Sequence, residues 1–284
     1  MSAGAETITV GRPRPGLGVR ALRAIRRHAL AVFAVAVLVY LLLPIAVVAL
    51  FSFNDPAGRY NYTWSGFTLD HWLNPFAVPG LQDAIVVSLE IALLASLLAT
   101  ILGTPIALAL ARYRYRGRGA TNTLVFMAMT APEIVLGASL LTLFLNLGVA
   151  RGFWTIFFAH VMFNISFVVV TVRARLVGFD RHLEEAAMDL GATPWTTFVR
   201  VTLPLIAPGI LAGALLAFAL SIDDFIITNF NAGATVTFPM FVWGAARIGA
   251  PPQVNVIGTT IFVVAVGLML ANVLFQQRRP KGAA

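Results

Sequence analysis

Six long apolar runs dominate the sequence and decide the solvent in which the chain can fold. Each is near or above the roughly 20 residues that cross about 30 Å of hydrocarbon as a helix. With 59% hydrophobic residues and a mean hydropathy of +0.85, the chain has more apolar surface than one soluble core could cover. We therefore predict an all-α polytopic membrane protein with six transmembrane helices, over residues 28–51, 82–111, 122–148, 152–173, 205–228 and 254–276.

The segments outside these runs complete the predicted organisation. Residues 1–27 form a tail that ends in alternating arginines and apolar residues, a pattern typical of a short interfacial amphipathic helix. The first run is too long for the apolar core of a signal peptide and lacks a small-residue cleavage site, so we expect a retained anchor. The transmembrane domain covers 28–277, with one long loop at 174–204, and residues 278–284 form a second tail.

The distribution of basic residues predicts the orientation. With the N-terminus in the cytoplasm, the inner segments hold 17 of the 20 Lys and Arg residues, and only Arg59, Arg151 and Arg247 lie outside. This is the asymmetry of the positive-inside rule, so both termini are expected in the cytoplasm. The net charge of +8 then reflects orientation and contact with anionic lipid headgroups, and no basic and aromatic platform favours nucleic-acid binding.

The sequence lacks several residues and motifs that ATP hydrolysis, zinc binding or cysteine catalysis would need. The one lysine is Lys281, in the C-terminal tail, and no GxxxxGK[ST] loop exists to hold nucleotide phosphates, so any ATPase must be a separate polypeptide. The absence of cysteine excludes thiolate zinc sites, disulfides and cysteine nucleophiles. The four histidines lack metal-ligand spacing, and for His160, inside the fourth run, we favour packing or hydrogen bonding over a proton relay.

The loop between the fourth and fifth runs is far longer than the other inner connections. Asp180 can cap a helix whose first turns place Glu184 and Glu185 at the positive end of the helix dipole, and Gly191 can end that helix. Pro194 then suits the first turn of a second short helix. The sequence therefore predicts a helix, glycine turn and helix exposed to the cytoplasm.

This loop resembles the EAA signature of binding-protein-dependent ABC importer permeases. The matching elements are Glu185-Ala186-Ala187, then Gly191, then Val201-Thr202-Leu203-Pro204, with Val201 where isoleucine is usual. The resemblance implies a type I ABC importer permease (MetI-like) fold in which this loop forms the coupling helix against an ATPase subunit. An ordinary amphipathic hairpin is the alternative. The residues that the resemblance assigns to ATPase coupling are Glu184, Glu185, Ala186, Ala187, Asp189, Gly191, Leu203 and Pro204.

A narrower resemblance, to the permease subunits of spermidine/putrescine importers, covers most of the chain. It rests on Phe51-Ser-Phe-Asn54, Trp64-Ser-Gly-Phe-Thr68, Gly103-Thr-Pro-Ile-Ala107, Pro132-Glu-Ile-Val-Leu-Gly137, Ser221-Ile-Asp-Asp-Phe-Ile-Ile-Thr228 and Phe238-Pro239. It implies a non-enzymatic subunit in a bacterial cell membrane that works with a second permease, two copies of an ATP-binding subunit using ATP and Mg, and an extracytoplasmic polyamine-binding protein. Whether the second permease is this chain or a paralogue stays open.

Four acidic residues fall within the predicted spans, and each costs about 2.5 to 3.5 kcal/mol at the bilayer centre unless it is paired or hydrated. No lysine or arginine lies in the same spans, so an organic cation such as a polyamine is a plausible counter-charge. The four are Glu90, Glu133, Asp223 and Asp224.

The faces of the fifth predicted helix separate the two aspartates. One small and polar stripe repeats at helical spacing, comprising Gly213, Ala217, Ser221, Asp224 and Thr228. Asp223 lies about a quarter turn away among leucines and isoleucine. We therefore expect Asp224, with Ser221 and Glu133, to line a substrate pathway, while Gly213 and Ala217 suit close helix packing.

Two alternatives remain from the sequence. The same coupling loop would serve an ABC importer of another small solute. A stand-alone ion-coupled carrier or channel would explain the acids but leaves the loop unexplained, and a membrane enzyme ranks third because no nucleophile, metal site or acid/base pair is apparent.

Overall fold

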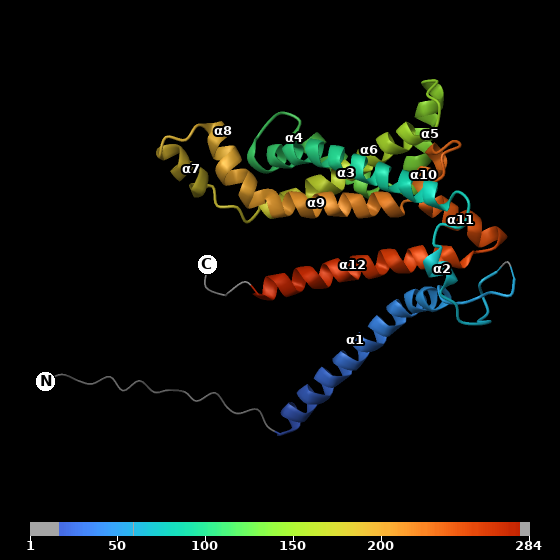
Figure 1. The fold of residues 1–284 in the computed structure, drawn as a ribbon. Coiled ribbons are helices and arrows are strands. Elements are labelled where there is room, and N and C mark those ends of the chain that lie inside the picture. The colour runs from blue at the N-terminus through green and yellow to red at the C-terminus, as the bar shows by residue number, and fades with distance from the viewer. Residues whose placement is uncertain (1–16, 59, 279–284) are drawn as a thin grey trace. The chain divides into compact units, whose positions relative to one another are not determined.

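The computed structural model describes residues 17–58 and 60–278, without the side chains of residues 17–27, 268, 269 and 271–278. Within that part of the chain the secondary structure is helical, apart from one isolated bridge between Asn54 and Phe67. The chain divides into a terminal unit (17–57, 61–73 and 252–278) and a central unit (58, 60 and 74–251). The terminal unit holds α1 (Leu17–Phe51), α2 (Asp70–Leu73) and α12 (Pro252–Arg278). The central unit holds α3 (Leu81–Arg112), α4 (Arg118–Thr130), α5 (Glu133–Asn146), α6 (Phe153–Leu176), α7 (His182–Asp189), α8 (Pro194–Thr197), the π-helical turn η1 (Phe198–Thr202), α9 (Leu203–Asp223), α10 (Ile226–Asn231) and α11 (Phe238–Ile248) (Figure 1).

In the terminal unit, α1 and α12 contact each other, and hydrogen bonds and aromatic contacts connect the residues of the loop after α1. Asn54 is fully buried and donates from Nδ2 to Asn61 Oδ1 (2.7 Å) and to the Thr63 carbonyl (2.8 Å). Nearby, Phe53 stacks on Trp72 with ring centroids 5.2 Å apart. The loop therefore has a small core of its own.

In the central unit, α3, α6 and α9 pack on one another around an apolar core. Small residues allow the close approach, because a Cβ added to Gly103 would lie only 2.9 Å from Val168 Cγ1. On α9, a Cβ at Gly213 would lie 3.5 Å from Val168 Cα, which agrees with the helix-packing interpretation of Gly213 and Ala217. Large apolar side chains such as Leu97 and Leu215 cover much of the unit's outside, as expected for contact with lipid.

The described residues contain four helices long and apolar enough to cross a membrane: His28–Phe51, Leu81–Arg112, Phe153–Leu176 and the continuous path Pro194–Asp223. The pair α4 and α5 makes a fifth if it counts as one span, although it bends by 108°. In α12 the stretch assessed, Pro252–Gly267, is a shorter apolar helix. The all-helical membrane class is thus confirmed, while the count of six spans stays a prediction.

Two predicted spans differ from continuous helices. The third, expected over 122–148, breaks because Pro132 disfavours helical geometry at Ala131, which has ψ of 133°. The fifth, expected over 205–228, begins earlier through α8 and η1 and breaks at Asp224, which is extended with ψ of 122°. Asp224 then caps α10 with its side chain, a local bond that competes with helix continuation.

The predicted tails fall partly outside the description. The sequence predicts an interfacial helix within residues 1–27. The structure has residues 17–27 as the first part of α1, continuous with the first span. Residues 1–16 and 279–284 lie outside the described residues.

Candidate functional site

The loop predicted to couple to an ATPase folds as two short helices joined by a glycine turn. Asp180 Oδ1 accepts a hydrogen bond from the His182 N–H (3.0 Å) at the start of α7. Gly191 has φ of +88°, its N–H donates to Met188 O, and the Ala192 N–H donates to Ala187 O. This pair of bonds is a Schellman motif, which needs a left-handed residue and so favours glycine.

The two adjacent glutamates of α7 face different surroundings. Glu184 Oε1 lies 2.6 Å from Arg112 Nη1 at the end of α3 and accepts a hydrogen bond from the Thr202 hydroxyl of η1. Glu185 is exposed and pairs with its neighbour His182, also exposed, at 3.1 Å. Glu184 therefore ties α7 to the helices behind it, whereas Glu185 faces outward.

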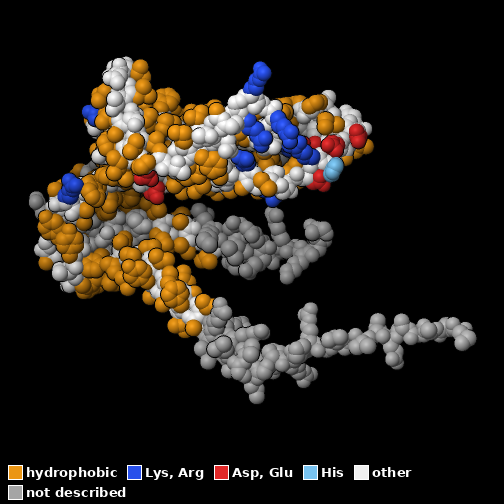
Figure 2. Space-filling view, turned by 180° about the vertical axis from the view of Figure 1, so that it is seen from behind, with side chains coloured by type: hydrophobic (Ala, Val, Ile, Leu, Met, Phe, Trp, Pro, Cys, Tyr) orange, Lys and Arg blue, Asp and Glu red, His pale blue; other side chains and the backbone are white. Residues whose placement is uncertain are grey.

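The outer surface of α7 and α8 mixes acidic and apolar side chains. Leu190 is 91% exposed and Trp195 is 73% exposed, beside the exposed Glu185 and Asp189. Figure 2 shows acidic side chains and a histidine at this end of the central unit, with basic side chains gathered next to them. Of the other predicted coupling residues, Ala186, Gly191 and Pro204 are exposed, and Ala187 and Leu203 are half-buried. Such a surface suits protein docking.

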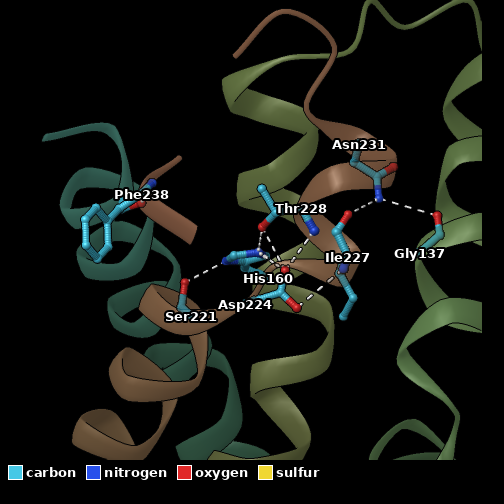
Figure 3. A network of polar contacts seen from close by, with 9 residues as sticks. Gly137, His160, Ser221, Asp224, Ile227, Thr228, Asn231 and Phe238 are labelled. Carbon is cyan, nitrogen blue, oxygen red and sulfur yellow. Dashed lines mark hydrogen bonds and ion pairs between the residues drawn. The ribbon is translucent and has the colours of Figure 1, made fainter. Parts of the chain in front are cut away.

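A buried polar network lies where α9 ends, between α6 and α10 (Figure 3). His160 of α6 is 1% exposed, and its Nδ1 lies 2.6 Å from Ser221 Oγ. Its Nε2 lies 3.2 Å from Asp224 Oδ2 and 2.9 Å from Thr228 Oγ1. Because a carboxylate only accepts, the Nε2 N–H points toward Asp224, and Nδ1 shares a hydrogen bond with the Ser221 hydroxyl.

Asp224 also starts the short helix α10. Its Oδ2 accepts from the N–H and the hydroxyl of Thr228, both at 2.7 Å, and Oδ1 accepts from the Ile227 N–H at 3.4 Å. Farther along, Asn231 Nδ2 donates to the Ile227 carbonyl (2.8 Å) and to Gly137 O of α5 (3.4 Å). The carboxylate of Asp224 is thus fully engaged inside the chain.

The other predicted pathway acids have exposed side chains. Asp223, Glu90 and Glu133 all lie on the surface of the central unit. Next to the aspartates, Phe225 packs against Trp243 of α11 with ring centroids 5.2 Å apart and the ring planes tilted by 40°. The structure brings Ser221 and Asp224 together around His160 but leaves the side chain of Asp223 exposed.

Sequence reasoning missed two partners of the predicted residues. It found no basic residue in the spans to face the acids, whereas His160 faces Asp224 directly. It also did not connect Arg112 with Glu184. In both cases the only signal is an ionisable side chain at the right depth, since the partners lie far apart in the sequence. Among the described residues, no three metal-ligating side chains converge on a cation position.

Comparisons with known proteins agree with this architecture. Residues 75–278 match the family model described as binding-protein-dependent transport system inner membrane component. The chain is 37% identical over 251 residues to the spermidine/putrescine transport system permease protein PotC of Escherichia coli strain K12, covering 88% of this chain and 94% of that protein. It is 38% identical over 240 residues to the putrescine transport system permease protein PotI of the same strain, covering 81% of this chain and 84% of that protein.

Solved structures share the fold at low sequence identity. A chain of a bacterial ABC transporter involved in the import of the acidic polysaccharide alginate superposes with a TM-score of 0.63 at 18% identity, covering 95% of this chain and all of that one. A chain of the MetNI methionine ABC transporter gives a TM-score of 0.56, covering 68% of this chain and 92% of that one. The family match spans most of the chain, and the fold is that of ABC importer permeases. The chain therefore belongs to the family of binding-protein-dependent transport system inner membrane components.

Proposed function

We propose that this chain is the permease subunit of a bacterial ABC importer that moves a polyamine, spermidine or putrescine, into the cell. ATP, with Mg, is hydrolysed by two copies of a separate subunit. A second permease, which we infer to be a paralogue, completes the membrane pathway, and an extracytoplasmic protein delivers the substrate. Both termini lie in the cytoplasm, in line with the positive-inside distribution of arginines.

The single observation that carries the coupling role is the exposed pair of helices α7 and α8. The Schellman motif at Gly191 ends α7 ahead of α8, and the pair presents Glu185, Leu190 and Trp195 outward. Aromatic and apolar side chains bordered by charge are typical of a protein interface. A carrier that works alone has no use for this surface.

The polyamine assignment rests on the names of the two relatives and on the acids of the central unit. Exposed carboxylates at Asp223, Glu90 and Glu133 can face the ammonium groups of a substrate in the assembled transporter. Asp224 and Ser221 both contact His160 inside the protein. We therefore infer that they support the site, whereas Asp223 contacts the substrate directly.

The test is ATP-dependent uptake of labelled spermidine and putrescine by the assembled complex in proteoliposomes. Asp223→Asn removes one charge-assisted contact, so the KM for uptake should rise roughly tenfold or more. Asp55→Asn, an exposed acid outside the predicted spans, is the matched control. If the complex shows no ATP-dependent uptake of either polyamine, the polyamine assignment is wrong. Uptake by this chain without an ATPase would instead favour the ion-coupled carrier.

A further inference from the structure

Glu184 stands at a junction of segments that are distant in the sequence. Its Oε1 accepts a hydrogen bond from Arg112 Nη1, 2.6 Å away at the end of α3, and another from the hydroxyl of Thr202 in η1. The Arg112 guanidinium also lies over the ring of Phe179, 5.0 Å from its centroid, and Phe179 packs against the apolar core that α3, α6 and α9 share. One carboxylate thus joins α7 to the helices around that core.

The rest of α7 is weakly attached. None of its residues is buried, and only Glu184 and Ala187 are half-buried. Among the described residues, no other ion pair or side-chain hydrogen bond joins α7 to a long helix. A push on α7 would therefore reach the long helices mainly through the Glu184 contacts and through α8 and η1.

The shielding of the pair strengthens the connection. The side chains of Arg112 and Glu184 are only 18% and 15% exposed, so their attraction is less screened than that of a surface pair. The second terminal nitrogen of Arg112, Nη2, is buried and has no hydrogen-bond partner in the described part of the chain. Loss of Glu184 would leave a largely buried guanidinium without any acidic partner.

We propose that Glu184 is a positioning residue for energy coupling: held by Arg112 and Thr202, it makes α7 move as one body with the ends of α3 and η1. This inference rests on the proposed importer function and deepens it. It assigns the two neighbouring glutamates different tasks. Glu185 meets the ATPase, and Glu184 carries the displacement into the permease.

The experiment uses the complete transporter with its ATPase and binding protein. Glu184→Gln should still co-purify with the ATPase, because the outward surface is untouched, but the ATP hydrolysed per polyamine transported should rise fivefold or more, roughly the range of such couplings. Glu185→Gln should instead weaken co-purification. Arg114→Gln, which removes the charge of an exposed arginine two positions after Arg112, is the control for a nearby change of charge and should keep the wild-type ratio.

A second variant separates transmission from folding. Arg112→Met with Glu184→Met removes both charges together, so no unpaired charge remains in the protein interior. The inference expects this double variant to fold and bind the ATPase while its ratio of ATP to polyamine stays raised. A wild-type ratio in either Glu184 variant, or loss of the ATPase from Glu184→Gln alone, overturns the inference. If the wild type itself transports no polyamine, the proposed function fails instead.

Discussion

Replacing Asp224 by alanine should destabilise the protein, whereas the same change at the neighbouring Asp223 should not. Asp224 accepts hydrogen bonds from two backbone N–H groups at the start of α10, and loss of such a cap costs about 0.5–2 kcal/mol. The change also leaves the buried His160 without its carboxylate, at a cost of about 1–3 kcal/mol. The sum is about 1.5–5 kcal/mol.

The assay is thermal unfolding of the purified protein in detergent. At roughly 2–4 °C per kcal/mol for a chain of this size, Asp224→Ala should lower the apparent Tm by about 3–20 °C. Asp223 is exposed, so Asp223→Ala should change the stability by less than about 0.5 kcal/mol. Uptake by Asp223→Ala should nevertheless fall.

Two outcomes would refute this reasoning. If Asp224→Ala unfolds within about 2 °C of the wild type, the cap and the histidine contact do not hold the break between α9 and α10. Equal losses of stability in both alanine variants would show that burial does not distinguish the two aspartates. Asp224→Asn, which keeps one carbonyl acceptor for Thr228, should fall between Asp224→Ala and the wild type.

Three further predictions follow from local geometry. Gly191→Leu forces a side chain into the left-handed region, at a cost of about 1–2 kcal/mol, and should reduce co-purification of the ATPase; full retention would argue against a docking role for this turn. Gly103→Ala places a Cβ 2.9 Å from Val168 Cγ1 and should lower the apparent Tm, whereas Gly119→Ala, which meets nothing within 4 Å, should leave it unchanged or raised; equal effects would contradict the packing of α3 on α6. Asn54→Ala removes the centre of the loop after α1 and should speed limited proteolysis there, and an unaltered cleavage rate would count against an ordered loop.

Apolar runs predicted the membrane class and most of the long helices, because length and hydropathy are local properties. Pro132 itself indicates the break between α4 and α5, but a hydropathy averaged over the whole apolar run does not show this break. The break at Asp224 has no glycine or proline to mark it. It follows from a side chain that bonds to the next helix, which depends on the surrounding fold.

The candidate site was predicted only in part, for a similar reason. Helical spacing placed Ser221 and Asp224 on one face, and both do meet His160. Helical spacing alone does not show that this face points into the protein, because it is α6, distant in the sequence, that buries the face. Likewise, the sequence grouped Glu184 with Glu185, and the contacts of Glu184 with Arg112, 72 positions away, and with Thr202 separate them.

The unbroken path from Pro194 to Asp223 joins two places that the sequence treats separately. It covers 30 residues through α8, η1 and α9, with a bend before α9 (Figure 1). The last part, α9, has 21 residues and is about 32 Å long, so a tilt of about 10° about its Leu203 end moves the Asp223 end sideways by about 5 Å. In the proposed importer, a small tilt at the end of α9 that adjoins α7 and α8 would therefore displace the carboxylate proposed to contact the substrate.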